Sequence, residues 1–257
     1  MSTATKTYIG LAIIVIAFYL GLTYLPQLTG TCMDGECGYS VGEILISIAF
    51  PLAGVVLPIA LEMILFGKGL TAALSDLGIT RFSWTGIRIA LIYLLPLIVF
   101  IPLFALLTQA SLRLNPNWGW LILNLILVNG LAEETMMRGF VFRHLRSERT
   151  FWRAAALSTV YFAAYHIPLI FTNGAAVGIT SVTVAIPLGL LTAYIYERSG
   201  NTIWGAVLLH SMYNGLVMLF LFPADIQPIA SLLYLLVGII VSTLMLVQSV
   251  SGRLWST

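Results

Sequence analysis

The sequence predicts an all-α polytopic membrane protein, and its composition and patterning lead to this fold class. Of its 257 residues, 60% are hydrophobic and 9% are charged, and the mean hydropathy is +1.00. Soluble domains are about 45–50% apolar and about 25% charged, so a water-soluble globular domain is excluded. The apolar residues fall in long stretches with short polar segments between them. No repeat or long linker divides the chain, so we expect residues 1–257 to form a single membrane domain.

Eight stretches are long and apolar enough to cross a bilayer, which takes roughly 20 residues. They run approximately from Tyr8 to Leu25, Ile44 to Phe66, Ile87 to Thr108, Trp118 to Phe142, Ala154 to Thr172, Ala176 to Tyr196, Ile203 to Phe222 and Ile229 to Val250. The first stretch is too long for a typical signal-peptide core, and no A-x-A-like cleavage site follows it. We therefore expect it to be an uncleaved anchor, which gives about eight transmembrane helices.

The segment from Gly69 to Trp84 is too polar to span the membrane. Its apolar residues recur at helical spacing, at Leu70, Ala73, Leu74 and Leu77. Such a pattern indicates a short amphipathic helix that lies in the membrane interface.

The distribution of positive charge predicts the orientation. With the N-terminus inside, ten of the twelve Lys and Arg fall in cytoplasmic segments, while the outer loops hold only Arg113 and a span holds Arg138. Because positively charged loops stay in the cytoplasm, we expect both termini there and place the protein in the cell membrane. No basic face interleaved with exposed aromatic residues is present, so no nucleic-acid partner is expected.

Two cysteines in the whole chain exclude a disulfide-rich scaffold and a zinc cluster built on cysteine. Both Cys32 and Cys37 lie in the predicted outer loop between the first two spans. On the oxidising side of the membrane they are expected to form a disulfide that closes a small loop, and two free thiols are the alternative.

Ionisable side chains inside the spans are few, and each is a functional hypothesis because charge at membrane depth is costly. Glu62 lies near Lys68 at the inner end of the second span, so we expect it to reach the interface. His144 lies in the Arg-rich inner loop and is expected to be solvated. The deeper group consists of Glu133, Glu134 and Arg138 in the fourth span, His166 in the fifth, and His210 with Asn214 in the seventh.

The two adjacent glutamates differ in their local partners. They lie roughly nine residues from the inner end of the span, or about 13 Å deep. Glu134 and Arg138 are four residues apart, so they share a helix face and neutralise each other. Glu133 points elsewhere and needs a partner on another helix, a metal ion or a proton. This spacing favours Glu133 over Glu134 as a base, and His166 is its expected partner.

This set of side chains suits the hydrolysis of an amide. A carboxylate and an imidazole, Glu133 and His166, can activate a water molecule. A second imidazole and a carboxamide, His210 and Asn214, share a helix face and can stabilise an oxyanion. Alternatively, Glu133, His166 and His210 could hold a divalent metal such as zinc and leave one position open for water. H-E-x-x-H and G-x-S-x-G motifs are absent, and both metal-dependent and metal-free mechanisms stay open.

Three motifs on three separate apolar stretches resemble a known family. Glu133 to Arg138 matches E-E-x-x-x-R, Phe162 to His166 matches F-x-x-x-H, and His210 to Asn214 matches H-x-x-x-N. In this order they resemble the CPBP family of intramembrane proteases, also called the Abi or type II CAAX prenyl endopeptidase family. The resemblance covers roughly residues 118–222.

The resemblance implies an eight-helix membrane endopeptidase whose chamber opens toward the cytoplasm and the bilayer. By analogy, Glu133 and His166 activate the water, and His210 with Asn214 forms the oxyanion pocket. Supporting roles fall to Glu134, Arg138 and Phe162. The substrate would be a membrane-associated protein or peptide, which is prenylated in the eukaryotic members. Family members are often described as metalloproteases, although the motifs do not settle whether a metal takes part.

Two other classes of function compete with proteolysis. A non-catalytic bacteriocin-immunity or scaffold protein would keep these residues for stability alone. A transporter would use Glu133 and the histidines as a proton relay, and it would be expected to show internal repeats or paired broken helices. No such repeats are present in the sequence, so the transporter ranks last.

Overall fold

The computed structural model describes residues 5–17 and 41–250, and it confirms the all-α fold class. The chain begins with a helix over Thr5–Ala17. The regular α-helices that follow are α2 (Val41–Phe66), α3 (Leu70–Asp76), α4 (Trp84–Thr108), α5 (Trp118–Asn124), α6 (Arg143–Arg146), α7 (Phe151–Tyr165), α8 (Leu169–Thr172), α9 (Ala175–Arg198), α10 (Trp204–Gly215) and α11 (Gln227–Val250). Two π-helical segments, η1 (Leu125–Ala132) and η2 (Thr135–Phe142), interrupt the fourth predicted span.

All eight predicted stretches contain helix within the described residues. Within the described residues, five helices are long and apolar enough to cross a membrane, or six if α2 and α3 count as one span bent by 115°. The helix α3 confirms the predicted short amphipathic helix, with Ala73 and Leu77 buried. The cysteines Cys32 and Cys37, and the disulfide predicted between them, lie outside the described residues.

The seventh predicted span is shorter as a helix because its outer end takes another conformation. Only 12 residues form α10, and the chain continues as a 3₁₀ turn, η3 (Leu216–Leu219), and a two-residue strand, β2 (Phe220–Leu221). This strand pairs antiparallel with β1 (Arg113–Leu114), and the Asn115 N–H donates to the Leu219 carbonyl at 2.8 Å. The non-helical backbone is thus hydrogen-bonded within the protein, as membrane proteins require.

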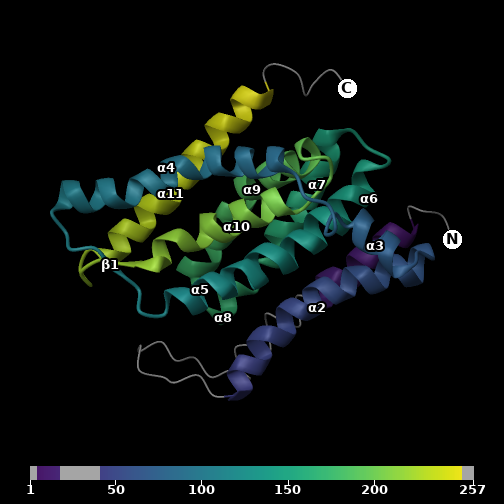
Figure 1. Cartoon of the computed structure of the whole chain (residues 1–257), viewed down its shortest axis with the longest axis horizontal. Helices are drawn as coiled ribbons and strands as arrows, with labels where there is room; N and C mark the ends of the chain where they lie inside the picture. The colour runs from purple at the N-terminus through teal and green to yellow at the C-terminus, as the bar shows by residue number, and fades with distance from the viewer. Residues whose placement is uncertain (1–4, 18–40, 251–257) are drawn as a thin grey trace.

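The helix α10 lies in the middle of the bundle, where it packs against α4, α9 and η1 (Figure 1). Most of its side chains are buried, including Val207, Leu209 and His210. A helix covered all round by protein needs no lipid-facing apolar stripe. The fold therefore places His210 at the centre of the molecule.

Close packing between η1 and α10 depends on Gly130. A Cβ at this position would lie 2.3 Å from Ser211 Oγ and 2.9 Å from Val207 Cγ1. Small residues let membrane helices approach closely and gain dispersion contacts. This approach brings the glutamates of the fourth span beside His210.

The loop after α3 fixes the start of α10. Backbone N–H of Ile203 donates to the Gly78 carbonyl at 3.3 Å, and the Trp204 indole donates to the Ile79 carbonyl at 2.9 Å. Thr202 Oγ1 donates to the Arg81 carbonyl at 2.7 Å. These bonds set the depth at which α10 enters the bundle.

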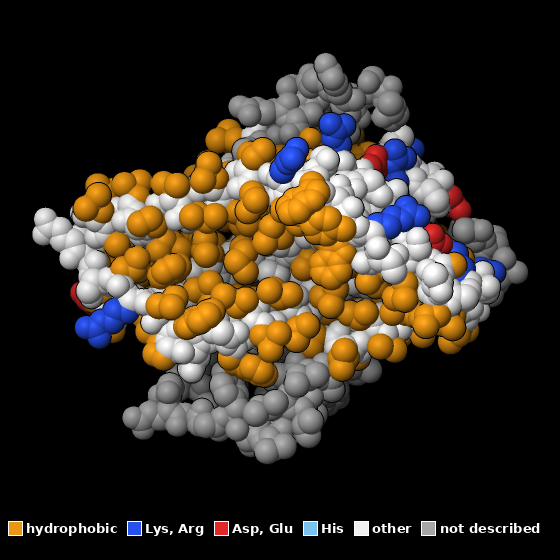
Figure 2. Space-filling view, in the orientation of Figure 1, with side chains coloured by type: hydrophobic (Ala, Val, Ile, Leu, Met, Phe, Trp, Pro, Cys, Tyr) orange, Lys and Arg blue, Asp and Glu red, His pale blue; other side chains and the backbone are white. Residues whose placement is uncertain are grey.

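Charged side chains gather toward one end of the molecule. The helices α3 and α6 lie at this end and β1 lies at the opposite end, with a broad hydrophobic surface between them (Figures 1 and 2). We call this region, which contains Lys68, Arg81, Arg143, Arg146 and Arg149, the basic end. The clustering agrees with the predicted segregation of positive charge.

At the basic end, the predictions for Glu62 and His144 are both wrong. Glu62 is fully buried, and His144 is 6% exposed rather than solvated. Glu62 Oε1 accepts from His144 Nε2 at 2.7 Å and from the Arg143 guanidinium, and Lys68 Nζ forms an ion pair with Glu62 Oε2 at 2.9 Å. The ring of Phe66 stacks on His144 at 4.2 Å between centroids. These three partners compensate the buried carboxylate. The sequence could not show this compensation, because Arg143 and His144 come from a helix distant in sequence.

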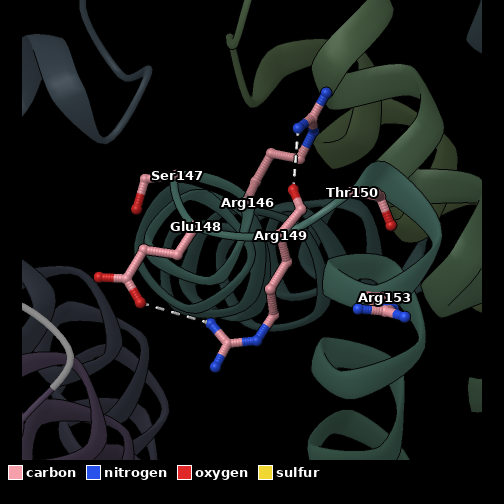
Figure 3. Close-up of a pocket in the computed structure, with 6 residues that line it drawn as sticks. All are labelled: Arg146, Ser147, Glu148, Arg149, Thr150 and Arg153. Atoms are coloured by element: carbon pink, nitrogen blue, oxygen red, sulfur yellow. Dashed lines mark hydrogen bonds and ion pairs between the residues drawn. The ribbon is translucent and has the colours of Figure 1, made fainter. Parts of the chain in front are cut away.

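The loop between α6 and α7 is hollowed, with a volume of about 410 Å³ lined by Arg146, Ser147, Glu148, Arg149, Thr150 and Arg153 (Figure 3). The guanidinium groups of Arg146 and Arg149 point in opposite directions (Figure 3). Arg146 donates to both oxygens of Glu197 at 2.9 and 3.2 Å, and Arg149 donates to Tyr8 Oη at 2.7 Å. These arginines therefore fasten the loop to α9 and to the first helix.

Replacing the buried carboxylate of Glu62 is expected to destabilise the basic end. We expect Glu62→Gln to lower the stability by about 2–3 kcal/mol, since Lys68 and Arg143 lose their shared partner but are partly exposed to water. The measurement is the midpoint of thermal unfolding in detergent. Glu148→Gln is the matched control, because Glu148 is 42% exposed and 3.8 Å from Arg149, and its effect should be within about 0.5 kcal/mol. Equal effects of the two substitutions would contradict the buried cluster.

The contact between η1 and α10 generates a second prediction. Gly130→Ala forces Ser211 and Val207 to move, and we expect a loss of about 1–3 kcal/mol in the same unfolding measurement. In the control variant Gly119→Ala, the new methyl group meets nothing within 4 Å. This substitution should leave the unfolding midpoint unchanged or raise it. An unchanged midpoint for Gly130→Ala would show that this contact does not set the helix spacing.

Candidate active site

The two glutamates lie where the fourth span departs from α-helical geometry. Residues Trp118–Arg146 form one continuous helical span, and Glu133 and Glu134 join its two π-helical segments, η1 and η2. Wide π turns inside α-helices are frequently found at functional sites. Neither segment was predicted, because apolar spacing alone does not distinguish a π turn from an α turn.

The predicted pair between Glu134 and Arg138 is confirmed. Arg138 Nε lies 3.2 Å from Glu134 Oε2, and Arg138 Nη2 donates to the Gly189 carbonyl at 3.1 Å. The guanidinium carbon lies 4.8 Å from the centroid of the Phe162 ring. Glu134 and Arg138 are almost completely buried, so the ion pair is held away from water and anchored to both α7 and α9.

His210 lies between the two carboxylates. Its Nδ1 is 2.6 Å from Glu134 Oε1, and its Nε2 is 3.8 Å from Glu133 Oε2. Because a carboxylate paired with arginine can only accept a hydrogen bond, Nδ1 carries the proton in this contact. The bond to Glu134 thus orients the ring and turns Nε2 toward Glu133.

The partner of Glu133 differs from the predicted one. The hydroxyl of Tyr165 donates to Glu133 Oε1 at 3.2 Å, whereas His166 was the expected partner. The sequence argument overlooked Tyr165, although a tyrosine deep in an apolar helix needs a partner for its hydroxyl. That requirement is the signal that could have identified it.

His166 lies immediately after the last residue of α7, and Pro168 follows two residues later. Its Nδ1 donates to the Phe162 carbonyl at 2.8 Å, and this backbone acceptor leaves Nε2 with the lone pair in the neutral ring. Phe162 contacts both histidines edge-on, at 4.9 Å from His166 and 5.5 Å from His210 between ring centroids. Phe162 therefore links the F-x-x-x-H motif to the other two motifs.

Asn214 follows His210 by one helical turn on α10. Asn214 and His166 are half-buried, whereas Glu133, Glu134 and His210 are 4% exposed or less. The two half-buried side chains thus form the more accessible edge of the site. The structure brings together through direct contacts Glu133, Glu134, Arg138, Phe162, Tyr165, His166 and His210. Asn214 shares a helix face with His210, but in the described part of the chain no hydrogen bond joins it to this cluster.

Several polar atoms in this cluster are buried without a hydrogen-bond partner in the described part of the chain, including Glu133 Oε2 and His210 Nε2. Buried groups of this kind are expected to meet a ligand or water. With His166 Nε2 they provide the donor types of a His₂Glu zinc site. Among the residues that the structure describes, however, no three His, Cys, Asp or Glu side chains lie close enough to share an ion. The residues as arranged do not fit a resident metal.

Comparison with known proteins agrees with the three motifs. A family model described as "Type II CAAX prenyl endopeptidase Rce1-like" matches residues 115–216, which include all three motifs. A protein named "CAAX prenyl protease 2" from Methanococcus maripaludis is 24% identical over 103 residues, which cover 36% of this chain and 38% of that protein. The chain thus spans little more than a third of the length of this relative. The match of residues 115–216 to the model of type II CAAX prenyl endopeptidases agrees with the family that the three motifs resemble.

Proposed function

We propose that this protein is an intramembrane endopeptidase that hydrolyses a peptide bond with a water molecule activated by Glu133. The observation that carries the proposal is the placement of His210 between two carboxylates. Its Nδ1 is held by Glu134, and its Nε2 faces Glu133 Oε2 at 3.8 Å. Glu133 and His210 each present one unsatisfied polar atom toward the same space inside a buried site.

In the proposed reaction, Glu133 Oε2 removes a proton from the water as the water oxygen attacks the carbonyl carbon of the peptide bond. The carbonyl oxygen becomes an oxyanion, which the Asn214 carboxamide stabilises by a hydrogen bond. His210 contributes a second hydrogen bond from Nε2 when its ring is protonated at both nitrogens. Glu133 then transfers its proton to the leaving amine. His166, with its Nε2 lone pair available, assists Glu133 in holding the water.

The supporting residues keep this geometry. Arg138 neutralises Glu134, and Glu134 holds the ring of His210 in one orientation. Phe162 packs against Arg138 and both histidines. A site held on packed helices needs little rearrangement during the reaction, which favours electrostatic stabilisation of the transition state.

We propose a membrane-associated protein or peptide as the substrate. The site lies inside a bundle with a broad hydrophobic surface, which favours a substrate that is itself anchored in the bilayer (Figure 2). The names of the family and of the relative refer to CAAX prenyl proteins, so a prenylated C-terminal peptide is the first substrate to test.

We also propose that the basic end faces the cytoplasm and that the protein resides in the cell membrane. Lys and Arg near membrane spans favour the cytoplasmic side.

Removing the base is expected to abolish cleavage. Glu133→Gln keeps the size of the side chain and should lower kcat by about 10²–10⁴-fold, because an amide cannot accept the proton. The assay measures cleavage of a prenylated peptide and of a membrane-peptide library by purified protein in lipid vesicles. Glu148→Gln, at the exposed loop, is the control and should cleave normally.

These two variants also separate the alternative functions. If Glu133→Gln folds and cleaves as the wild type does, the proposal is wrong. A non-catalytic immunity or scaffold protein would keep its phenotype in Glu133→Gln and His166→Ala. A transporter would show substrate flux that depends on a proton gradient.

The metal question has its own measurement. Because the donors are not grouped around one position, we expect chelating agents to leave cleavage unchanged. Elemental analysis of the wild type beside Glu133→Gln, His166→Ala and His210→Ala checks this expectation. Stoichiometric zinc in the wild type, lost together with activity in the variants, would instead make Glu133 and the two histidines metal ligands.

A further inference from the structure

We infer that Tyr165 is a positioning residue that fixes the orientation of the Glu133 carboxylate and thereby selects Oε2 as the basic oxygen. This inference rests on the proposed function, and it concerns a residue at one of the unspecified positions of the F-x-x-x-H motif. Tyr165 is the last residue of α7 and is 6% exposed. It therefore acts from within the protein and not as a group at the surface.

The hydrogen bond from Tyr165 makes the two carboxylate oxygens of Glu133 different. Oε1 accepts from the Tyr165 hydroxyl at 3.2 Å, whereas Oε2 has no hydrogen-bond partner among the described residues and faces His210 Nε2. A carboxylate without this bond could rotate about its last torsion, which is broad and roughly two-fold. Tyr165 thus keeps the free oxygen directed toward the reacting groups.

Ring contacts hold the phenol of Tyr165 in place. Its ring stacks on Phe162 with 6.2 Å between centroids and 23° between planes, and it meets His166 edge-on at 4.6 Å. The ring of Tyr165 thus contacts Phe162, which in turn contacts both histidines. Since few rotamers satisfy these contacts, the hydroxyl is presented to Glu133 with little loss of entropy on binding a substrate.

Proximity to the site does not by itself require a hydroxyl, because phenylalanine would fill the same apolar volume. The hydroxyl is the only polar atom of the side chain, and burying it without a partner is unfavourable. Its bond to a carboxylate is charge-assisted and stronger than a bond between neutral groups. The arrangement therefore distinguishes positioning, which needs the hydroxyl, from packing, which needs only the ring.

The test compares Tyr165→Phe with Tyr161→Phe, a tyrosine one turn earlier on α7 that is half-buried. We expect Tyr165→Phe to lower kcat by about 10-fold or more, the effect of losing a hydrogen bond to a charged group, with KM little changed. In a Glu133→Gln background the same substitution should have no further effect on the residual rate. Tyr161→Phe should leave kcat and KM unchanged.

A second readout does not depend on cleavage. The infrared carboxylate band of Glu133 is obtained by subtracting the spectrum of Glu133→Gln from that of the wild type. We expect this band to shift in Tyr165→Phe and to stay in place in Tyr161→Phe. A band that does not move, or a shifted band with unchanged kcat, overturns the inference.

The two proposals fail in different ways. A wild-type protein that cleaves no substrate refutes the proposed function, and Tyr165 then has no reaction to support whatever the infrared band shows. A wild type that cleaves, together with a Tyr165→Phe variant that cleaves equally well, refutes only the role of Tyr165.

Discussion

Two neighbouring carboxylates buried in an apolar helix bundle are the constraint on which the rest of this structure depends. Each ionised group removed from water costs several kcal/mol unless other polar groups compensate it. Glu134 is compensated by Arg138 and His210, and Glu133 is bonded by Tyr165. These partners come from the same span, from α7 and from α10, so satisfying the glutamates fixes which helices must be adjacent.

The packing of the bundle serves this arrangement. The central helix α10 can carry His210 because protein, not lipid, surrounds it. Gly130 lets the fourth span approach α10 closely enough for both carboxylates to reach one imidazole. Hydrogen bonds from Thr202, Ile203 and Trp204 to the loop after α3 hold the helix at its depth. The position of His210 is thus set partly by contacts at the start of its helix.

The basic end contains another buried carboxylate, Glu62, that cationic neighbours compensate. Glu62 is as deeply buried as Glu134, and Lys68, Arg143 and His144 form close ion pairs with it that join two helices. The candidate site differs because Glu133 Oε2 and His210 Nε2 face each other at 3.8 Å without a hydrogen bond. The buried cluster in which two polar atoms face each other without a close contact is the one to associate with a reaction.

Composition and apolar periodicity by themselves determined the membrane class, the helical fold and the segregation of positive charge, since each follows from the exclusion of polar groups from lipid. Spacing along one helix also determined the Glu134–Arg138 pair, and three short motifs pointed to the family whose model matches residues 115–216. Only the tertiary structure decided the partners that come from other helices: Tyr165 for Glu133, His210 for both glutamates, and His144 for Glu62. Sequence periodicity states which face of a helix a side chain occupies, but not which helix lies against that face. That choice depends on packing across the whole bundle, including close contacts at glycines and π turns that local patterns do not reveal.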